Sequence, residues 1–455
     1  MDTLDPPQTQ ALTAEAARIC IEVLRAIEAD RSQLTQLSRE QRRELLTLAG
    51  LIAKPERHDL VKMAKAFRRA DRAAARARDA LIIERTGLRV QRRATRYTPL
   101  WLPQPQTGDT AQPQPTLGNA LNCYICKQPF TLTHRYYDSM CRECGDFNYA
   151  KREQSADLSG QYALVTGARV KIGFQAALKL LRAGAHVVVT TRFAADAAQR
   201  YALESDYAQF KERLQIHALD LRHSPSVELF AHFMLERLPR LDHLVNNACQ
   251  TVRRPAAYYA HLLEKESTAV ARVQAEEPFP AHRYDEDMQQ VDLRHTNSWR
   301  LRLHEVETPE LLEVHLVNAI APYILNARLK PLMVATPGAH KHIVNVSAME
   351  GQFYRTTKTE RHPHTNMAKA ALNMMTRTSA PDYLRDGIHM NAVDTGWVTD
   401  EDPAVHAARK AELGFAPPLD IIDGAARILD PIFAGSRTGT HLWGQFLKDY
   451  KPAPW

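Results

Sequence analysis

The sequence lacks the features that mark secreted and membrane proteins. The segment Met1–Pro7 has neither a basic start nor an apolar stretch, so we expect no signal peptide. No apolar run approaches about 18 residues, so we expect no membrane span and no membrane partner. Only six cysteines occur among 455 residues. Four of them form spaced pairs, which suits a metal in a reducing compartment better than disulfides. The expected location is cytoplasmic.

Length and composition describe a globular protein of more than one domain. A chain of 455 residues allows about two to four domains. Hydrophobic residues make up 44% and charged residues 24%, as in ordinary globular proteins. The net charge of +7 is uneven, because residues 51–100 hold fourteen Lys/Arg against five Asp/Glu. The remainder is close to neutral, so the basic balance does not indicate that the C-terminal half binds nucleic acid.

The N-terminal region, residues 1–96, is predicted to be helical and basic. Apolar residues recur at helical spacing in residues 12–30 and 38–53. The segment 55–96 begins with a longer helix, expected over about 55–84. One face of that helix carries four basic side chains: Lys65, Arg69, Arg72 and Arg76. They would suit an acidic protein or a nucleic acid, although a solvated helix face is the simpler interpretation.

Two Cys-x-x-Cys pairs follow a Pro- and Gln-rich linker, residues 97–119. The segment 120–157 contains these pairs, with fourteen residues between them: Cys123, Cys126, Cys141 and Cys144. Four thiolates at this spacing predict one tetrahedral Zn²⁺ site. No ligand position is left open, so the zinc is expected to be structural. The connection to the next segment is short, so we expect this segment to pack on the domain that follows.

A glycine turn between a strand and a helix organises residues 158–455. The apolar run at 162–166 ends at Gly167, and a helical pattern begins before Gly173. A second buried strand follows at 186–190, which completes a right-handed βαβ unit. Such a turn directs backbone N–H groups and a helix N-terminus at one point, as a pyrophosphate site requires.

Alternating strands and helices continue to the C-terminus. Strands are predicted at 162–166, 186–190, 214–218, 241–246, 342–347, 388–393 and 441–447. This pattern predicts an α/β fold, a doubly wound Rossmann parallel sheet of about seven strands. An insertion at about 250–312 interrupts it at the C-terminal ends of the strands, where ligands bind. The insertion is expected to form a lid or partner surface, or else a surface elaboration away from the pocket.

The glycine turn resembles the Thr-Gly-x-x-x-Gly-x-Gly motif of the short-chain dehydrogenase/reductase family. Gly167 and Gly173 match the outer glycines, while Lys171 replaces the middle one. Lys171 must either point away or touch phosphate with its ammonium group. The resemblance covers about 300 residues and implies the following cofactor-binding residues: Gly167, Arg169, Lys171, Ile172, Gly173, Arg192, Asp220, Leu221, Asn247, Ala248, Lys369, Gly396 and Thr399.

Two arginines indicate which dinucleotide is preferred. Arg192 follows the second strand, at the position where an acid would hold a ribose 2′-hydroxyl and an arginine accommodates a 2′-phosphate. Arg169 lies in the glycine turn. Together they favour NADP(H) over NAD(H).

The family's catalytic residues are only partly present. Asn318 matches the helix asparagine whose carbonyl positions a relay water in the family. The catalytic strand keeps Ser347, but Ala348 stands at the usual catalytic serine position.

The Tyr-x-x-x-Lys motif departs most from the family. Tyr354 and Lys358 have the required spacing, but Lys369 has the family's distance to the sixth strand. Lys369 is therefore the aligned lysine, and Thr365 occupies the tyrosine position. A threonine hydroxyl is too weak an acid to replace a tyrosine. Tyr354 or His364 could supply the proton, the reaction could need none, or the domain could bind NADP(H) without turnover.

Two functional hypotheses follow from this resemblance. The first is an NADP(H)-dependent oxidoreductase that transfers hydride to or from a carbonyl or alcohol. The second is an inactive NADP(H)-binding scaffold or sensor that recruits a partner through its zinc segment and basic helices. A homo-oligomer is compatible with either. The sequence does not identify the small-molecule substrate.

Overall fold

The computed structural model describes residues 13–93, 116–266, 278–280, 282–285, 287–338, 340–354 and 358–455. The chain divides into two compact units, Met1–Ala75 and Arg76–Trp455. The second unit contains both the four-cysteine segment and the Rossmann sheet. Most of the expected 97–119 linker lies outside the described residues, and its last residues belong to a strand. No helix in the described ranges is long and apolar enough to cross a membrane.

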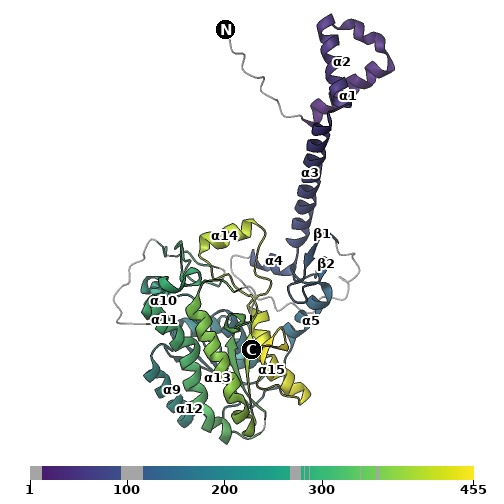
Figure 1. Cartoon of the computed structure of the whole chain (residues 1–455). Coiled ribbons are helices and arrows are strands. Elements are labelled where there is room, and N and C mark those ends of the chain that lie inside the picture. Colours follow the sequence, from purple (N-terminus) through teal and green to yellow (C-terminus); the bar gives the residue numbers. More distant parts are fainter. Residues whose placement is uncertain are drawn as a thin grey trace. The chain divides into compact units, whose positions relative to one another are not determined.

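The N-terminal unit consists of helices, drawn in purple in Figure 1. They lie close to the predicted ranges: α1 (Ala14–Ala29), the 3-10 helix η1 (Arg31–Gln36), α2 (Arg39–Ala53) and the first part of α3 (Arg57–Ile83). Thr13 caps α1, and Ser38 forms a capping box with Gln41 at the start of α2. No residue of α1 or α2 is buried. Their apolar stripes therefore face outward within this unit.

An eight-stranded sheet forms the centre of the second unit, in the order β10-β9-β8-β7-β6-β3-β4-β5. Its strands are β3 (Tyr162–Thr166), β4 (His186–Thr191), β5 (Leu214–Ala218), β6 (His243–Asn246), β7 (Lys341–Ser347), β8 (Ile388–Asp394), β9 (Phe446–Lys448) and β10 (Lys451–Ala453). Seven are parallel, and β10 returns antiparallel to β9. The fold class is confirmed, with one strand more than predicted because the C-terminus adds a short edge hairpin.

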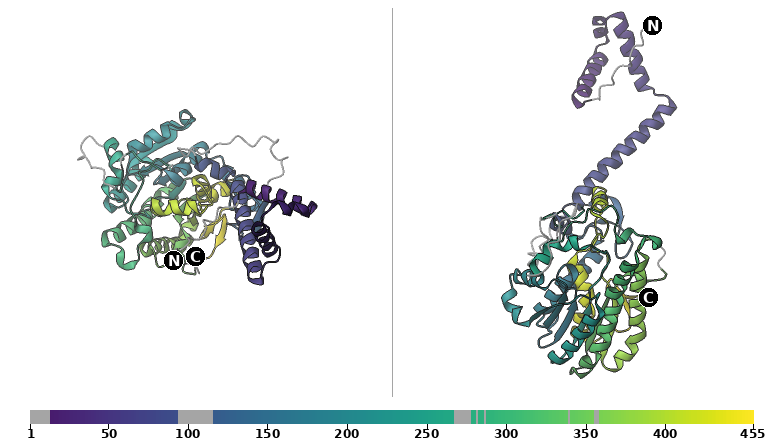
Figure 2. Two further views of the ribbon diagram at one scale, coloured as in Figure 1. Left: turned by 90° about the horizontal axis from the view of Figure 1, so that it is seen from above. Right: turned by 90° about the vertical axis from the view of Figure 1, so that its left-hand side faces the viewer.

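Helices cover both faces of this sheet, as Figure 2 shows. One face carries α6 (Lys171–Arg182) and α15 (Ile421–Thr438), and the other carries α9 (Ser224–Arg237), α12 (Ala321–Ala335) and α13 (Pro363–Arg385). Successive residues of a strand point to opposite faces. Accordingly, Ile343 belongs to the core of the second face, whereas Val344 and Val346 belong to that of the first.

The four-cysteine segment packs against the Rossmann sheet's helices, as expected. It contains the hairpin β1 (Thr116–Asn122) and β2 (Pro129–Leu132) and the helix α5 (Arg142–Glu153), preceded by α4 (Gly87–Arg92). Its tyrosines share a buried cluster with the start of α15. Tyr137 donates a hydrogen bond to Asp423 at 2.5 Å, and Arg152 donates one to Asp420 at 2.5 Å. Apolar and ionic contacts thus join this segment to the sheet domain.

Short helices connect the strands and build the insertion. Outside the insertion these are α7 (Ala194–Ala202), α8 (Tyr207–Phe210), α11 (Thr308–His315) and α14 (Ala404–Glu412). The insertion contains the 3-10 helix η4 (Ala256–Tyr259) and α10 (Ala260–Glu266), and then the 3-10 turns η5 (Ser298–Arg300) and η6 (Leu303–Glu305). Its contacts with the glycine turn place it at the C-terminal edge of the sheet, where a ligand-covering segment was expected.

Candidate cofactor and active site, and a four-cysteine metal site

The glycine turn is packed tightly against the end of β6. Gly167 has φ +67°, and an added Cβ would lie 2.8 Å from the Cα of Ala248. A Cβ on Gly173 would collide with the amide of Asn247. That amide donates to the Thr166 carbonyl at 3.0 Å, and the Ala248 N–H donates to the Thr166 hydroxyl at 3.0 Å. Glycine is therefore required at both positions, and the four predicted residues meet at one site.

Lys171 adopts the backbone conformation that the family's middle glycine would provide. Its φ is +55°, in the left-handed region that non-glycine residues seldom occupy. Its ammonium lies 3.8 Å from the carboxylate of Asp287 in the insertion. Burial lowers the pKa of Lys171, but Glu401, Asp287 and Asp285 outweigh it and hold the pKa above its usual range. The ammonium is thus directed at insertion and loop carboxylates.

The loop after β8 supplies a further acid, Glu401, whose charge acts on this lysine. Gly396 has φ +74°, and its N–H donates to the carboxylate of Asp394 at 2.7 Å. Thr399 donates its hydroxyl proton to Glu401 at 2.8 Å. Burial raises the pKa of Glu401, but the charges of Lys171 and Arg254 lower it below its usual value. The predicted Thr399 is therefore held by a carboxylate that the sequence analysis missed.

A cavity of about 460 Å³ opens where β4 and β5 end. Its lining includes Arg192, Asp220, Arg222, Arg254 and Tyr259. The guanidinium of Arg192 lies 4.6 Å from the centre of the Tyr259 ring, and Arg222 pairs with Asp220 at 2.6 Å. Burial raises the pKa of Asp220, but its bonds from Arg222 and the charge of Arg192 lower it overall. Three guanidinium groups therefore face one carboxylate.

Sequence reasoning did not assign Arg222 or Arg254 to the cofactor site, and it expected a further arginine, Arg169, to help select the dinucleotide. Arg222 follows Asp220 by two residues, which was a usable signal, whereas Arg254 comes from the insertion and had none. Arg169 is buried instead of lining this cavity. It donates to Asp196 and to Gln289, each at 2.7 Å. Arg169 therefore joins the glycine turn to α7 and the insertion, and Leu221 and Ile172 pack in the hydrophobic clusters on either side.

Asn318, Ser347 and Lys369 are buried around the C-terminal end of β7. Asn318 lies in the π-helical turn η7 (Leu316–Ile320), where backbone groups depart from α-helical pairing. Its side chain accepts from the Gln250 N–H at 2.8 Å and donates to the Gln250 carbonyl at 3.0 Å. Ser347 donates to Asn373 at 2.5 Å, and Lys369 donates to the Val346 carbonyl at 2.8 Å. The side chains of all three thus have partners within the protein.

The candidate proton donors occupy very different environments. Tyr354 is 89% exposed, whereas Thr365 and His364 are buried at the start of α13. The Thr365 hydroxyl has no hydrogen-bond partner among the described residues. The Nε2 of His364 lies 3.5 Å from a carboxylate oxygen of Glu310 on α11. Within the described chain, neither Tyr354 nor His364 hydrogen-bonds to Lys369.

A second cavity, of about 550 Å³, adjoins Glu310. Its walls come from the insertion, α11 and the turn after β5, and they carry both signs of charge: Arg222, Arg253, Arg254, Arg294, Glu305, Glu307, Glu310 and Glu313 are among them. Burial raises the pKa of Glu310, but the nearby side chains of His364 and Ser298 lower it overall. Glu310 therefore links His364 to this polar cavity.

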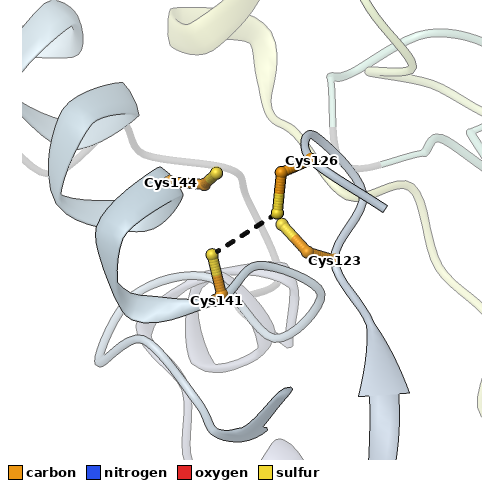
Figure 3. A group of neighbouring side chains, drawn as sticks. All are labelled: Cys123, Cys126, Cys141 and Cys144. Carbon is orange, nitrogen blue, oxygen red and sulfur yellow. Dashed lines mark hydrogen bonds between the residues drawn. The ribbon is translucent and has the colours of Figure 1, made fainter. Parts of the chain in front are cut away.

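The four predicted cysteines converge on one point, as Figure 3 shows. Their sulfur atoms all lie within 4.8 Å of one another, and those of Cys126 and Cys141 are 3.9 Å apart. A tetrahedral metal with bonds of about 2.3 Å requires sulfur separations of about 3.8 Å. Burial raises the pKa of Cys123, but N–H groups of Cys141, Cys126 and Ile125 point at its sulfur and lower it to about 7. The cluster could hold one metal ion.

Comparisons with known proteins agree with this architecture. Residues 161–273 match the family model described as short chain dehydrogenase, and residues 295–413 match the one described as Enoyl-(Acyl carrier protein) reductase. An uncharacterised protein of Acanthamoeba polyphaga mimivirus is 32% identical over 350 residues, which cover 72% of this chain and 74% of that protein. The dehydrogenase/reductase SDR family member 13 of Bos taurus is 38% identical over 104 residues, which cover 22% of this chain and 27% of that protein.

Solved structures that are similar to this chain include the RhlG/NADP active-site complex of Pseudomonas aeruginosa. It is 21% identical and has a TM-score of 0.46, with 64% of this chain and 95% of that chain covered. The two family matches span the sheet from β3 to beyond β8, including the glycine turn, Asn318 and Lys369. The chain therefore belongs to the short-chain dehydrogenase/reductase family, whose named members here are dehydrogenases and reductases.

Proposed function

We propose that the protein is an NADP(H)-dependent oxidoreductase acting on a carbonyl or an alcohol. When bound, the cofactor would supply or accept the hydride. The protein would bind and orient the cofactor and the substrate, and it would exchange the proton. The observation that carries this proposal is the cavity beside the glycine turn, where three arginines face a single carboxylate. Such a donor set fits a dianionic 2′-phosphate better than a neutral 2′-hydroxyl.

Arg192 and Arg222 contribute differently to this cavity. Arg222 is already neutralised in part by Asp220. Arg192 stacks on Tyr259 and has no ion pair among the described residues, so its N–H donors remain available for a phosphate. A charge-assisted hydrogen bond of this kind stabilises binding by about 1.5–3 kcal/mol. Arg192 is therefore the main determinant of the proposed preference for NADP(H).

We propose that His364 is the residue that exchanges the proton with the substrate oxygen. Tyr354 is 89% exposed, and threonine at position 365 is too weak an acid to protonate an alkoxide at neutral pH. His364 is buried immediately before Thr365, and Glu310 lies 3.5 Å from its Nε2. A carboxylate beside an imidazole orients the ring. Lys369 would orient the nicotinamide ribose, in line with its position in the family, after leaving the Val346 carbonyl.

Turnover of matched variants tests this assignment. A panel of ketones, aldehydes and alcohols is screened with NADPH or NADP, with cofactor absorbance as the measurement. His364→Gln should lose at least about 100-fold in kcat while NADPH affinity stays within twofold. Tyr354→Phe is the control and should retain wild-type turnover. Loss of activity in Tyr354→Phe, or full activity in His364→Gln, would contradict the assignment.

Thr365→Tyr distinguishes an oxidoreductase with an altered proton donor from a domain that binds NADPH but transfers no hydride. If hydride transfer is the protein's activity, a phenol four residues before Lys369 should restore activity to His364→Gln. A folded double variant that binds NADPH and remains inert on every substrate would argue against an oxidoreductase.

We further propose that the four cysteines bind one structural Zn²⁺. Four sulfur ligands in tetrahedral spacing suit zinc and leave no position for a substrate. Thiolates of this kind persist in a reducing compartment, so the cytoplasm is the proposed location. The metal would then stabilise the contact between this segment and the start of α15.

A non-catalytic scaffold is the second candidate function, because the N-terminal unit exposes what a partner would cover. Ile19, Val23 and Leu24 on α1 are each at least two-fifths exposed, as are Leu46 and Leu48 on α2. The basic side chains Lys65, Arg69 and Arg72 are exposed along the part of α3 that belongs to this unit, and Arg76 is the first residue beyond it. Such a surface fits a second copy of the chain or an acidic partner, including a nucleic acid. Size-exclusion chromatography with light scattering measures the molar mass with and without residues 1–75, and so distinguishes a second copy of the chain from an acidic partner.

A further inference from the structure

Histidines gather at the edge of the sheet opposite the cofactor site. In the strand register, His243 on β6 pairs with His342 on β7, and His342 pairs with His389 on β8. Paired residues of neighbouring strands share a face, and His340 lies two residues before His342 on the same side. His441, in the segment after α15, packs against these rings. Five of the chain's 19 histidines therefore meet at the N-terminal ends of three adjacent strands.

Three of these imidazoles approach one another closely enough to share an ion. One ring nitrogen from each of His340, His389 and His441 lies within 4.8 Å of the others. The ring centres of His340 and His441 are 4.1 Å apart, and those of His389 and His441 are 4.8 Å apart. His342 bridges to this group, with its Nε2 2.9 Å from the Nδ1 of His441. The His342 ring thus orients His441 from behind.

The position of His441 is built into the surrounding chain. A Cβ on Gly435 of α15 would collide with the His441 ring, so glycine makes room for it. The segment that carries His441 is bonded along β8: the Leu442 carbonyl accepts from Asn391 at 2.7 Å, and the Gly444 N–H donates to the Met390 carbonyl at 2.8 Å. His441 is therefore held over β7 and β8 by packing and by main-chain bonds.

We propose that His340, His389 and His441 form a second metal site, which binds a divalent transition-metal ion such as Zn²⁺ through three imidazole nitrogens and one water. Imidazole is a preferred ligand of Zn²⁺, Ni²⁺ and Cu²⁺. A tetrahedral Zn²⁺ with bonds of 2.0–2.1 Å requires nitrogen separations of about 3.3 Å. His340 is exposed, so its ring can leave its stack on His441 to reach that separation.

The site is separate from the four-cysteine cluster in chemistry and in place. Its ligands come from β7, β8 and the segment after α15, and none is a thiolate. An ion here would tie the segment that leads to β9 to the starts of β7 and β8. Binding to the folded state alone raises stability by mass action. The ion would therefore stabilise the N-terminal ends of β7 and β8 and the segment that leads to β9, without touching the cofactor edge.

Titration of the full chain with Ni²⁺ tests the site. The protein is first loaded with one equivalent of Zn²⁺ to fill the cysteine cluster, and Ni²⁺ binding is then followed by calorimetry and by the melting temperature. Wild type should bind one further equivalent and melt at a higher temperature. His340→Gln and His389→Gln should each weaken Ni²⁺ binding at least about tenfold and remove the rise in melting temperature.

His304→Gln is the matched control, because His304 is exposed in the insertion, on a different element from the three ligands. It should bind Ni²⁺ as wild type does. If the zinc-loaded wild type takes up no further ion, the proposal is wrong. It is equally wrong if Ni²⁺ binding is unchanged in both His340→Gln and His389→Gln. Because His340 is exposed, its replacement decides the question even if His389→Gln does not fold.

Discussion

The phenolic oxygen of Tyr124 accepts a hydrogen bond from the backbone N–H of Trp397 at 3.0 Å. Tyr124 lies between Cys123 and Cys126, and Trp397 lies in the loop after β8 between Gly396 and Thr399. Burial, together with the nearby carboxylate of Asp394, raises the pKa of Tyr124 above its usual value. The tyrosine therefore stays neutral and joins the four-cysteine cluster directly to a predicted cofactor loop.

This contact predicts that metal loss weakens cofactor binding. Cys126→Ser should remove one equivalent of zinc by elemental analysis and weaken NADPH binding, because the released knuckle no longer fixes the Trp397 N–H. Tyr124→Phe should retain the zinc and weaken NADPH binding by a smaller amount, about two- to tenfold for one lost hydrogen bond. A zinc-free Cys126→Ser protein with wild-type NADPH affinity would show that the two sites are independent.

The opposite charges of Lys171 and Glu401 should offset each other at the glycine turn, so that removing both should cost less NADPH affinity than removing Lys171 alone. Lys171→Gly removes the left-handed backbone cost of roughly 1 kcal/mol, but it also removes one of the positive charges that act on Glu401 and Asp287 beside the turn. We expect NADPH affinity to fall about tenfold from this repulsion. Adding Glu401→Gln should recover most of the loss, as calorimetry can measure. If Lys171→Gly alone binds NADPH more tightly than wild type, the lysine is not the balancing charge.

Lys179 reports on the packing of the four-cysteine segment. Its ammonium donates to the Arg152 carbonyl at 2.7 Å, and burial, with the charges of Arg152 and Arg182, lowers its pKa to about 8. Because the folded-state pKa is depressed below 10.5, the related stability is present above pH 10.5 and is lost as pH falls through about 8. As pH rises between these values, the free energy of unfolding of wild type should increase relative to that of Lys179→Met, by up to about 1.4 kcal/mol per pH unit.

Denaturant unfolding of both proteins between pH 7 and pH 10 checks this expectation. Below about pH 8 the two curves should run parallel, since the amine is protonated in both the folded and the unfolded chain. Parallel curves over the whole range would mean that Lys179 is hydrated in the folded protein.

Much of the sheet was predictable because its strands are buried on both faces. Such strands contain continuous apolar runs, as in Tyr162–Thr166 and His186–Thr191, and glycines mark the turns between them. The predicted strand at 441–447 overlaps β9, but β10 was missed because it has only three residues and lies at the edge. Local pattern carries little information about so short a strand.

The site was predictable where a single motif supplies the residues. Gly167, Gly173, Asn247 and Ala248 meet as expected, and the four cysteines converge. Residues contributed by the insertion, such as Arg254 and Gln289, have no sequence spacing that relates them to the turn. Arg169 illustrates the consequence, since its partners Asp196 and Gln289 could be identified only in three dimensions.

Calorimetric titration of NADPH and NADH into wild type and Arg192→Ala tests the central claim most directly. Wild type should bind NADPH at least about tenfold more tightly than NADH, and Arg192→Ala should weaken NADPH about 10- to 100-fold while changing NADH little. Arg385→Ala removes one exposed arginine elsewhere and should leave both affinities unchanged. Equal binding of NADPH and NADH by wild type, or binding of neither, would contradict the account.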